Sequence, residues 1–127
     1  MPEWKTGGCH CGAVRFEVRS EADSALICNC SICSMKGYLH LIVPRADFRL
    51  ISGEADLSLY QFNTGAARHY FCRVCGVSPH YIPRSHPDGV DVNMRCLDQI
   101  DLEKVRLEQF DGRNWENNIH SIAGYDS

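Results

Sequence analysis

The sequence predicts a mainly β fold, in which short strands pack as a sandwich or barrel and metal ions staple the domain together. Three observations support this fold class. Short β-rich runs recur at close spacing, and turn residues separate them. Helical signals are few, and seven of the eight cysteines fall into three tight clusters. Because a small domain has a limited core, metal ligands that join its segments add stability.

The strand signals run along almost the whole chain. The clearest is the alternation at residues 13–19, which places Val14, Phe16 and Val18 on one face. Later runs end at prolines, at glycines or at the cysteines of a predicted turn. The further expected strands are residues 39–43, 48–51, 57–62, 69–71, 80–82, 90–92 and 105–110.

Only two segments carry helical signals. Residues 30–36 are expected to form one short turn of helix, and residues 114–121 a short terminal helix. The longest loop is predicted at residues 83–89, which contain two prolines and a glycine. Because no linker-like stretch divides the 127 residues, we expect a single domain over residues 1–127.

Hydropathy and charge exclude several classes of protein. No apolar run approaches the roughly 20 residues that span a bilayer, so we expect no membrane attachment. The amino terminus lacks the apolar core of a signal peptide, which favours a cytoplasmic location. The net charge of −3 and the absence of a Lys/Arg run argue against nucleic acid as a partner.

The clustered cysteines predict metal binding. In a reducing compartment, repeated cysteine pairs favour metal ligation over disulfides. Four thiolates close a tetrahedral zinc site, whereas three leave one position open for chemistry. Two pairs and one triple therefore suggest two Zn²⁺ per chain, one structural and one able to take an outside ligand. The candidate metal ligands are Cys9, Cys11, Cys72, Cys75, Cys28, Cys30 and Cys33.

Spacing alone leaves the pairing of these clusters open. On a strand, Cys9 and Cys11 would project from one face and grip one ion. The Cys-x-x-Cys-Gly segment at 72–76 is typical of a tight turn that carries two thiolates. If that turn joined the cysteines of residues 30–33, the result would be a zinc ribbon. That arrangement would leave three clustered thiols unexplained.

Three further residues have two interpretations each. Cys96 is interpreted as a small buried side chain, or alternatively as a fourth ligand or a second thiol near the open metal. His40 and His69 are expected on strands, where they would face either a pocket or else solvent or the core. The six histidines as a group show no metal-ligand spacing.

Three segments together resemble the glutathione-dependent formaldehyde-activating enzyme family. They read GCHCGAVRFEV at 8–18, CNCSIC at 28–33 and FCRVCG at 71–76, in the family's order, and the resemblance runs from about residue 7 to 116. Shorter segments resemble the centromere protein V branch of that family. These are FNT at 62–64, PRS at 83–85, CLD at 96–98 and GRNWE at 112–116.

The resemblance implies a β-tent fold of packed antiparallel sheets, a structural zinc and a catalytic zinc. The structural ion would be held by the cysteine pairs at 9–11 and 72–75. Cys28, Cys30 and Cys33 would be the catalytic residues, holding an ion whose fourth position accepts the sulfur of glutathione. Residue 29 is Asn where many members carry His, which leaves the ligands intact.

The activity implied by the resemblance is that of a carbon–sulfur lyase. Glutathione and formaldehyde would combine to S-(hydroxymethyl)glutathione, and the reverse reaction or a related thiol adduct is also within its scope. Glutathione carries two carboxylates, so Lys36, Arg68 and Arg84 are candidate binding residues. The alternative is a non-enzymatic, zinc-stapled module that binds a protein or chromosomal partner. The sequence leaves the oligomeric state open.

Overall fold

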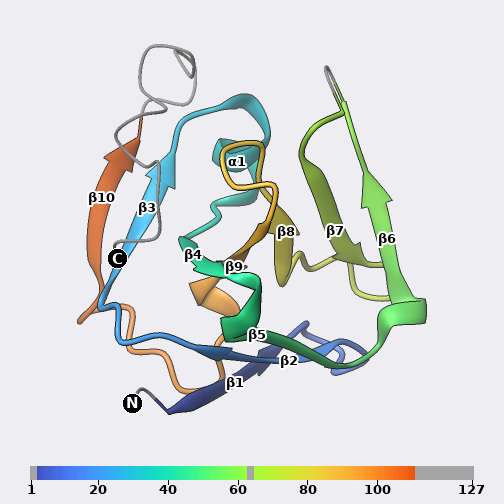
Figure 1. Ribbon diagram of the computed structural model, residues 1–127, viewed down its shortest axis with the longest axis horizontal. Helices are drawn as coiled ribbons and strands as arrows, with labels where there is room; N and C mark the ends of the chain where they lie inside the picture. Colours follow the sequence, from blue (N-terminus) through green and yellow to red (C-terminus); the bar gives the residue numbers. More distant parts are fainter. Residues whose placement is uncertain (1–2, 63–64, 111–127) are drawn as a thin grey trace.

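The computed structural model describes residues 3–62 and 65–110, which form two β-sheets that meet at one core (Figure 1). The predicted helix at 114–121 lies outside the described residues. Within the described ranges, no helix has the length and apolar character needed to cross a membrane.

The smaller sheet has three strands in the order β1–β2–β5. Both pairings are antiparallel, and β2 lies in the middle. In Figure 1 this sheet forms the lowest layer of the molecule. Its strands are β1 (Trp4–Gly8), β2 (Arg15–Arg19) and β5 (Phe48–Ser52).

The larger sheet has seven strands in the order β10–β3–β4–β9–β8–β7–β6. All its pairings are antiparallel except that of β3 with β10. The single α-helix of the described residues, α1 (Ser31–Lys36), connects β3 to β4. The strands are β3 (Ser24–Cys28), β4 (His40–Pro44), β6 (Leu57–Tyr60), β7 (Arg68–Cys72), β8 (His80–Ile82), β9 (Gly89–Asn93) and β10 (Arg106–Phe110), and three 3-10 turns are Arg45–Asp47, Glu54–Asp56 and Met94–Cys96.

The two faces of the larger sheet differ in chemistry. Its core face carries alternate residues of β3, β4 and β9, which pack against Phe16 and Val18 of the smaller sheet. Burial of these side chains is the main driving force for joining the sheets. The opposite face lies on the side of α1 (Figure 1). The buried residues of this core are Phe16, Val18, Ala25, Leu39, Leu41, Val43, Val90, Val92, Met94 and Leu97.

The predicted β fold class is confirmed, as are its antiparallel sheets. Every strand expected within the described residues is present, with ends that differ by a few residues, and so are the helical turn and the 83–89 loop. Two strands, β1 and β3, were missed. Strand β1 was not predicted because it contains Gly7 and Gly8, and glycine is unfavourable in strands. Only tertiary pairing with β2 makes this segment a strand.

His80 on β8 makes stability sensitive to acid. Its imidazole is 5% exposed and stacks between Tyr70 and Phe48, and burial lowers the pKa of His80 to about 4. The unfolded chain, with a His pKa near 6.5, therefore binds more protons between about pH 6.5 and 4. The stability from neutral His80 is complete above this window and is lost as pH falls through it.

We therefore expect His80→Phe to flatten the pH dependence of the free energy of unfolding between pH 6.5 and 4. The expected difference between the two proteins grows to about 3 kcal/mol across that window. Urea unfolding of both proteins in the same buffers measures it, because loss of metal in acid affects both alike. Parallel pH curves would contradict the assignment.

Candidate metal centres

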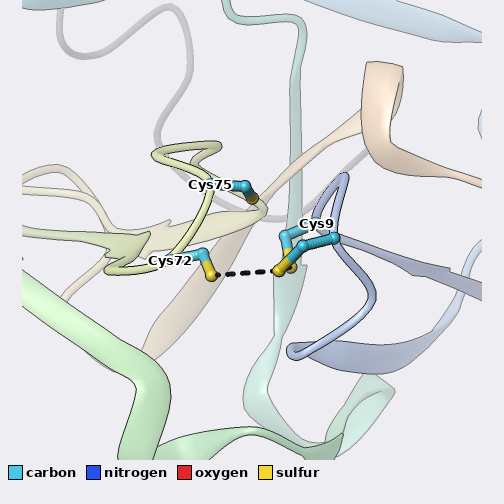
Figure 2. Close-up of side chains that lie close together, drawn as sticks. Cys9, Cys72 and Cys75 are labelled. Atoms are coloured by element: carbon cyan, nitrogen blue, oxygen red, sulfur yellow. Dashed lines mark hydrogen bonds between the residues drawn. The ribbon is translucent and has the colours of Figure 1, made fainter.

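Four thiols converge where the 9–14 loop meets the turn after β7 (Figure 2). The sulfur of Cys11 lies 3.6 Å from that of Cys9 and 3.7 Å from that of Cys72. With Cys75, all four sulfurs lie within 4.8 Å of one another. A tetrahedron with Zn–S bonds of about 2.3 Å has edges of about 3.8 Å, so the spacing fits zinc.

The first pair of thiols lies on a turn, and the expectation that Cys9 and Cys11 share a strand face is wrong. Strand β1 ends at Gly8, and the N–H of Gly12 donates to the carbonyl of Cys9 at 3.2 Å. Gly12 has a φ of +84°, a conformation that favours glycine. The turn, and not the strand alternation, brings both sulfurs to the same side.

The second pair lies on the predicted tight turn. The N–H of Gly76 donates to the carbonyl of Cys72 at 2.8 Å, and Gly76 has a φ of +81°. Backbone N–H groups also point at the sulfurs, as from Val74 to Cys72 at 3.4 Å. A hydrogen bond from Val77 lowers the pKa of Cys75 to about 6. Such donors stabilise thiolates, the form in which cysteine binds metal.

Three other thiols gather at the junction of β3 and α1. Cys28 is the last residue of β3, Cys30 is the N-cap of α1, and Cys33 lies in its first turn. Residues three apart on a helix lie on one face, which brings Cys33 back toward Cys30. The three sulfurs lie within 4.8 Å of one another. Gly37, in the left-handed conformation with φ +62°, ends the helix.

The electrostatics of this group favour a cation. Hydrogen bonds from Cys28 and Cys33 lower the pKa of Cys30 to about 2, so that one thiolate is held by two thiols. The same contacts raise the pKa of Cys33. A second and third negative charge at such short range require a neutralising ion, and three soft sulfur donors suit Zn²⁺.

The zinc-ribbon pairing is excluded by the grouping of the thiols. Cys72 lies with Cys9 and Cys11, whereas Cys30 lies with Cys28 and Cys33. All eight cysteines are free thiols. Cys96 belongs to neither group; its sulfur lies 3.8 Å from the carbonyl oxygen of Ser78, and burial raises its pKa to about 11. This agrees with its interpretation as a small, partly buried side chain.

The three cationic residues expected to bind glutathione lie in different places. Lys36 ends α1, and its charge acts on Cys33 and on His69. Arg68 precedes the buried His69 on β7, so the two side chains project from opposite faces of the strand. Arg84 is half-buried in the 83–88 loop. Lys36 therefore lies within electrostatic range of the three-thiol group.

Sequence reasoning missed one polar pair near this group. His40 Nδ1 lies 2.6 Å from Asp91 Oδ2, and both side chains are buried. The sequence predicts that His40 faces a pocket, solvent or the core, whereas its local pattern does not single out Asp91. The signal for Asp91 was a carboxylate between two valines of an apolar strand, a place where an unpaired charge is costly.

Comparison with known proteins places this geometry in a family. The sequence model of the glutathione-dependent formaldehyde-activating enzymes matches residues 4–113, which include all seven clustered cysteines. The chain belongs to the glutathione-dependent formaldehyde-activating enzyme family. The matched residues include both sheets and both thiol groups of the described structure.

One curated protein and one crystal structure show how far the similarity extends. A putative glutathione-dependent formaldehyde-activating enzyme of Halomonas elongata is 36% identical over 78 residues, which cover 54% of this chain. The match spans about half the length, 50%, of that curated relative. A crystal structure of a Rhodobacter sphaeroides protein is 37% identical with a TM-score of 0.73, covering 81% of this chain and 99% of that one.

Two zinc ions per chain are expected in the purified protein, because the thiols form two separate groups that each fit the ion. Elemental analysis of the wild type should give two zinc per chain, and Cys30→Ser should give about one. Cys96→Ser serves as the matched control and should keep two, since its sulfur lies in neither group. A wild type with one fully occupied zinc would contradict the expectation.

Proposed function

We propose that this protein catalyses the reversible addition of a glutathione thiol to formaldehyde, acting as a carbon–sulfur lyase or synthase. The product is S-(hydroxymethyl)glutathione, and related thiol adducts belong to the same chemistry. The observation that carries the proposal is the three-thiol group at Cys28, Cys30 and Cys33 in a chain of this family. The other group has four thiols, which is a closed set for zinc.

The two groups would therefore have different roles. A zinc ion held by Cys28, Cys30 and Cys33 would supply a Lewis acid with one coordination position left for a soft ligand such as a thiolate. Cys9, Cys11, Cys72 and Cys75, which form the four-thiol group, would hold the structural ion.

Lys36 is our candidate for binding a carboxylate of glutathione. It ends α1 three residues after Cys33, its side chain is exposed, and its charge interacts with that of Cys33. An ammonium there attracts an anionic substrate and orients it relative to the thiols. Arg68 and Arg84 remain further candidates, on the far face of β7 and in the 83–88 loop.

A binding module without catalysis is the second candidate, and the number of thiols distinguishes the two. A purely structural site is closed by four protein ligands, whereas the described residues bring three cysteines to this one. The proposed chemistry also needs reduced thiols, which a reducing compartment such as the cytoplasm maintains.

Glutathione binding tests the proposal. By calorimetry, the zinc-loaded protein should bind glutathione, and more tightly as pH rises toward the thiol pKa of about 8.5, because the bound form is the thiolate. S-Methylglutathione should bind much more weakly, since its sulfur is a thioether.

Two variants locate the site. Cys30→Ser should lose glutathione binding, whereas Cys96→Ser should keep it, because Cys96 lies in neither thiol group. If Cys30→Ser binds glutathione as the wild type does, or if the two ligands bind equally well, the proposed site is wrong.

A further inference from the structure

One face of the larger sheet carries a row of polar and aromatic side chains that starts beside the three-thiol group. Directly paired residues share a face of a sheet. The register pairs Leu26 with His40, and Cys28 follows Leu26 by two, so Cys28 and His40 lie on the same face. Asp91 pairs with Tyr81, and Tyr81 pairs with His69, which continue the row across β9, β8 and β7.

His40 is fixed within this row by Asp91. The imidazole is 5% exposed and the aspartate 1% exposed, and His40 Nδ1 lies 2.6 Å from Asp91 Oδ2. The hydroxyl of Tyr81 lies 3.3 Å from the same nitrogen, and Tyr38 packs on the ring with centroids 4.6 Å apart. Tyr38 is itself anchored, because its hydroxyl donates to the backbone oxygen of Asp91 at 2.6 Å.

The other nitrogen of His40 has no use in the fold. Nε2 is buried and has no hydrogen-bond partner among the described residues. Because Asp91 accepts the proton of Nδ1, the neutral ring carries its lone pair on Nε2. A buried polar atom without a partner costs about 1–3 kcal/mol, and Nε2 shares this state with Asp91 Oδ1 in the same pair and with His80 Nδ1 on the other face.

The surroundings connect His40 to the three-thiol group. When protonated, His40 lowers the pKa of the Cys30 thiol, after the larger effects of hydrogen bonds from Cys28 and Cys33. Besides Asp91 from β9, the ionisable groups around His40 are Tyr81 from β8, Tyr38 before β4, His69 from β7, and Lys36 and Cys30 at the two ends of α1.

We propose that His40, oriented by Asp91, carries the proton from the sulfur to the oxygen when a thiol adds to formaldehyde. The proposal rests on the proposed function of the three-thiol site. The S–H proton passes to Nε2 when the thiol binds, and a lone pair of the resulting thiolate then forms the C–S bond. The π pair of the carbonyl moves to its oxygen, which then takes the proton back from Nε2. The reverse order serves cleavage, and no oxidant or reductant is needed.

Proton release on glutathione binding gives a readout that is independent of turnover. Calorimetry of the zinc-loaded protein at pH 7, in two buffers of different ionisation enthalpy, counts the protons released. Glutathione that binds as a thiolate gives up about one proton. If His40 takes it, the wild type releases fewer protons to the buffer than His40→Gln, by up to one per chain. Gln keeps a donor for Asp91, which limits the effect on folding.

Two further variants sharpen the comparison. Asp91→Asn keeps an oxygen for Nδ1 but removes the charge that favours protonated His40, so proton release should move toward the His40→Gln value. His80→Phe removes a buried imidazole from the opposite face of the same sheet and should release protons as the wild type does. The rate of exchange between glutathione and its formaldehyde adduct, measured by NMR, should fall about 10²-fold in His40→Gln.

Equal proton release by wild type, His40→Gln and Asp91→Asn would overturn the role of His40 and leave the proposed function standing. Absence of glutathione binding to the wild type would instead overturn the proposed function, and the role of His40 with it. If His40→Gln fails to fold, Asp91→Asn decides by the same comparison.

Discussion

Replacing Cys72 by serine is expected to leave most of the chain unfolded at room temperature. Cys72 is fully buried and belongs to the four-thiol group, which joins the 9–14 loop to the turn after β7. Structural zinc contributes an apparent binding free energy of about 10–16 kcal/mol, whereas small domains have a net stability of about 5–15 kcal/mol. Losing a ligand of this site is therefore expected to cost about as much free energy as the whole net stability of the fold.

Cys30→Ser is the informative comparison, and we expect its melting temperature to stay within about 5 °C of the wild type. Cys28, Cys30 and Cys33 are neighbours in sequence, so an ion there closes no long loop. By contrast, Cys11 and Cys72 are 61 residues apart, and cross-linking them restricts the unfolded chain far more. Circular dichroism melts with zinc analysis measure both variants, with Cys96→Ser as control. Equal destabilisation by the two serines would contradict this division of roles.

Gly53→Ala is expected to lower the free energy of unfolding by about 2–5 kcal/mol. Gly53 has a φ of +89°, which costs a residue with a Cβ about 1–2 kcal/mol. An added Cβ would also collide with the carbonyl oxygen of Ala13 and lie 2.7 Å from Cα of Val14. Relieving that overlap costs about 1–3 kcal/mol more, because it displaces the backbone that follows the first cysteine pair.

Gly37→Ala provides the matched control for this prediction. Gly37 also has a positive φ, of +62°, but an added Cβ would meet nothing within 4 Å. Its substitution should therefore show the conformational cost alone. Chemical denaturation of both variants gives the difference that is due to crowding, and zinc content should fall further in Gly53→Ala. Identical losses in the free energy of unfolding for the two variants would show that the close approach of residues 13–14 to Gly53 does not affect stability.

Local patterns predicted most of the strands and the three cysteine clusters because these are properties of short segments, whereas spacing alone left the pairing of the clusters open. Alternation placed Phe16 and Val18 in the core, and the glycine after Cys75 marked the tight turn. The turn that holds Cys9 and Cys11 was interpreted as a strand, since a spacing of two fits both and only the bond from Gly12 to Cys9 decides.

Long-range pairing accounts for what the sequence did not predict. Strand β3 depends on its parallel partner β10, which is distant in sequence. The His40–Asp91 contact depends on a register between β4 and β9 that no local pattern contains. Each residue alone is unremarkable, and the pair is meaningful only because the sheet brings both to one face.

The different spans of the two thiol groups also bear on how the protein is made. A ribosome adds about 5–20 residues per second, so the 61 residues between Cys11 and Cys72 take several seconds to synthesise. During that time the first pair of thiols is present in the nascent chain without the second pair. Cys28, Cys30 and Cys33 emerge together and long before Cys72. We therefore expect the three-thiol group to acquire its ion before the four-thiol group does.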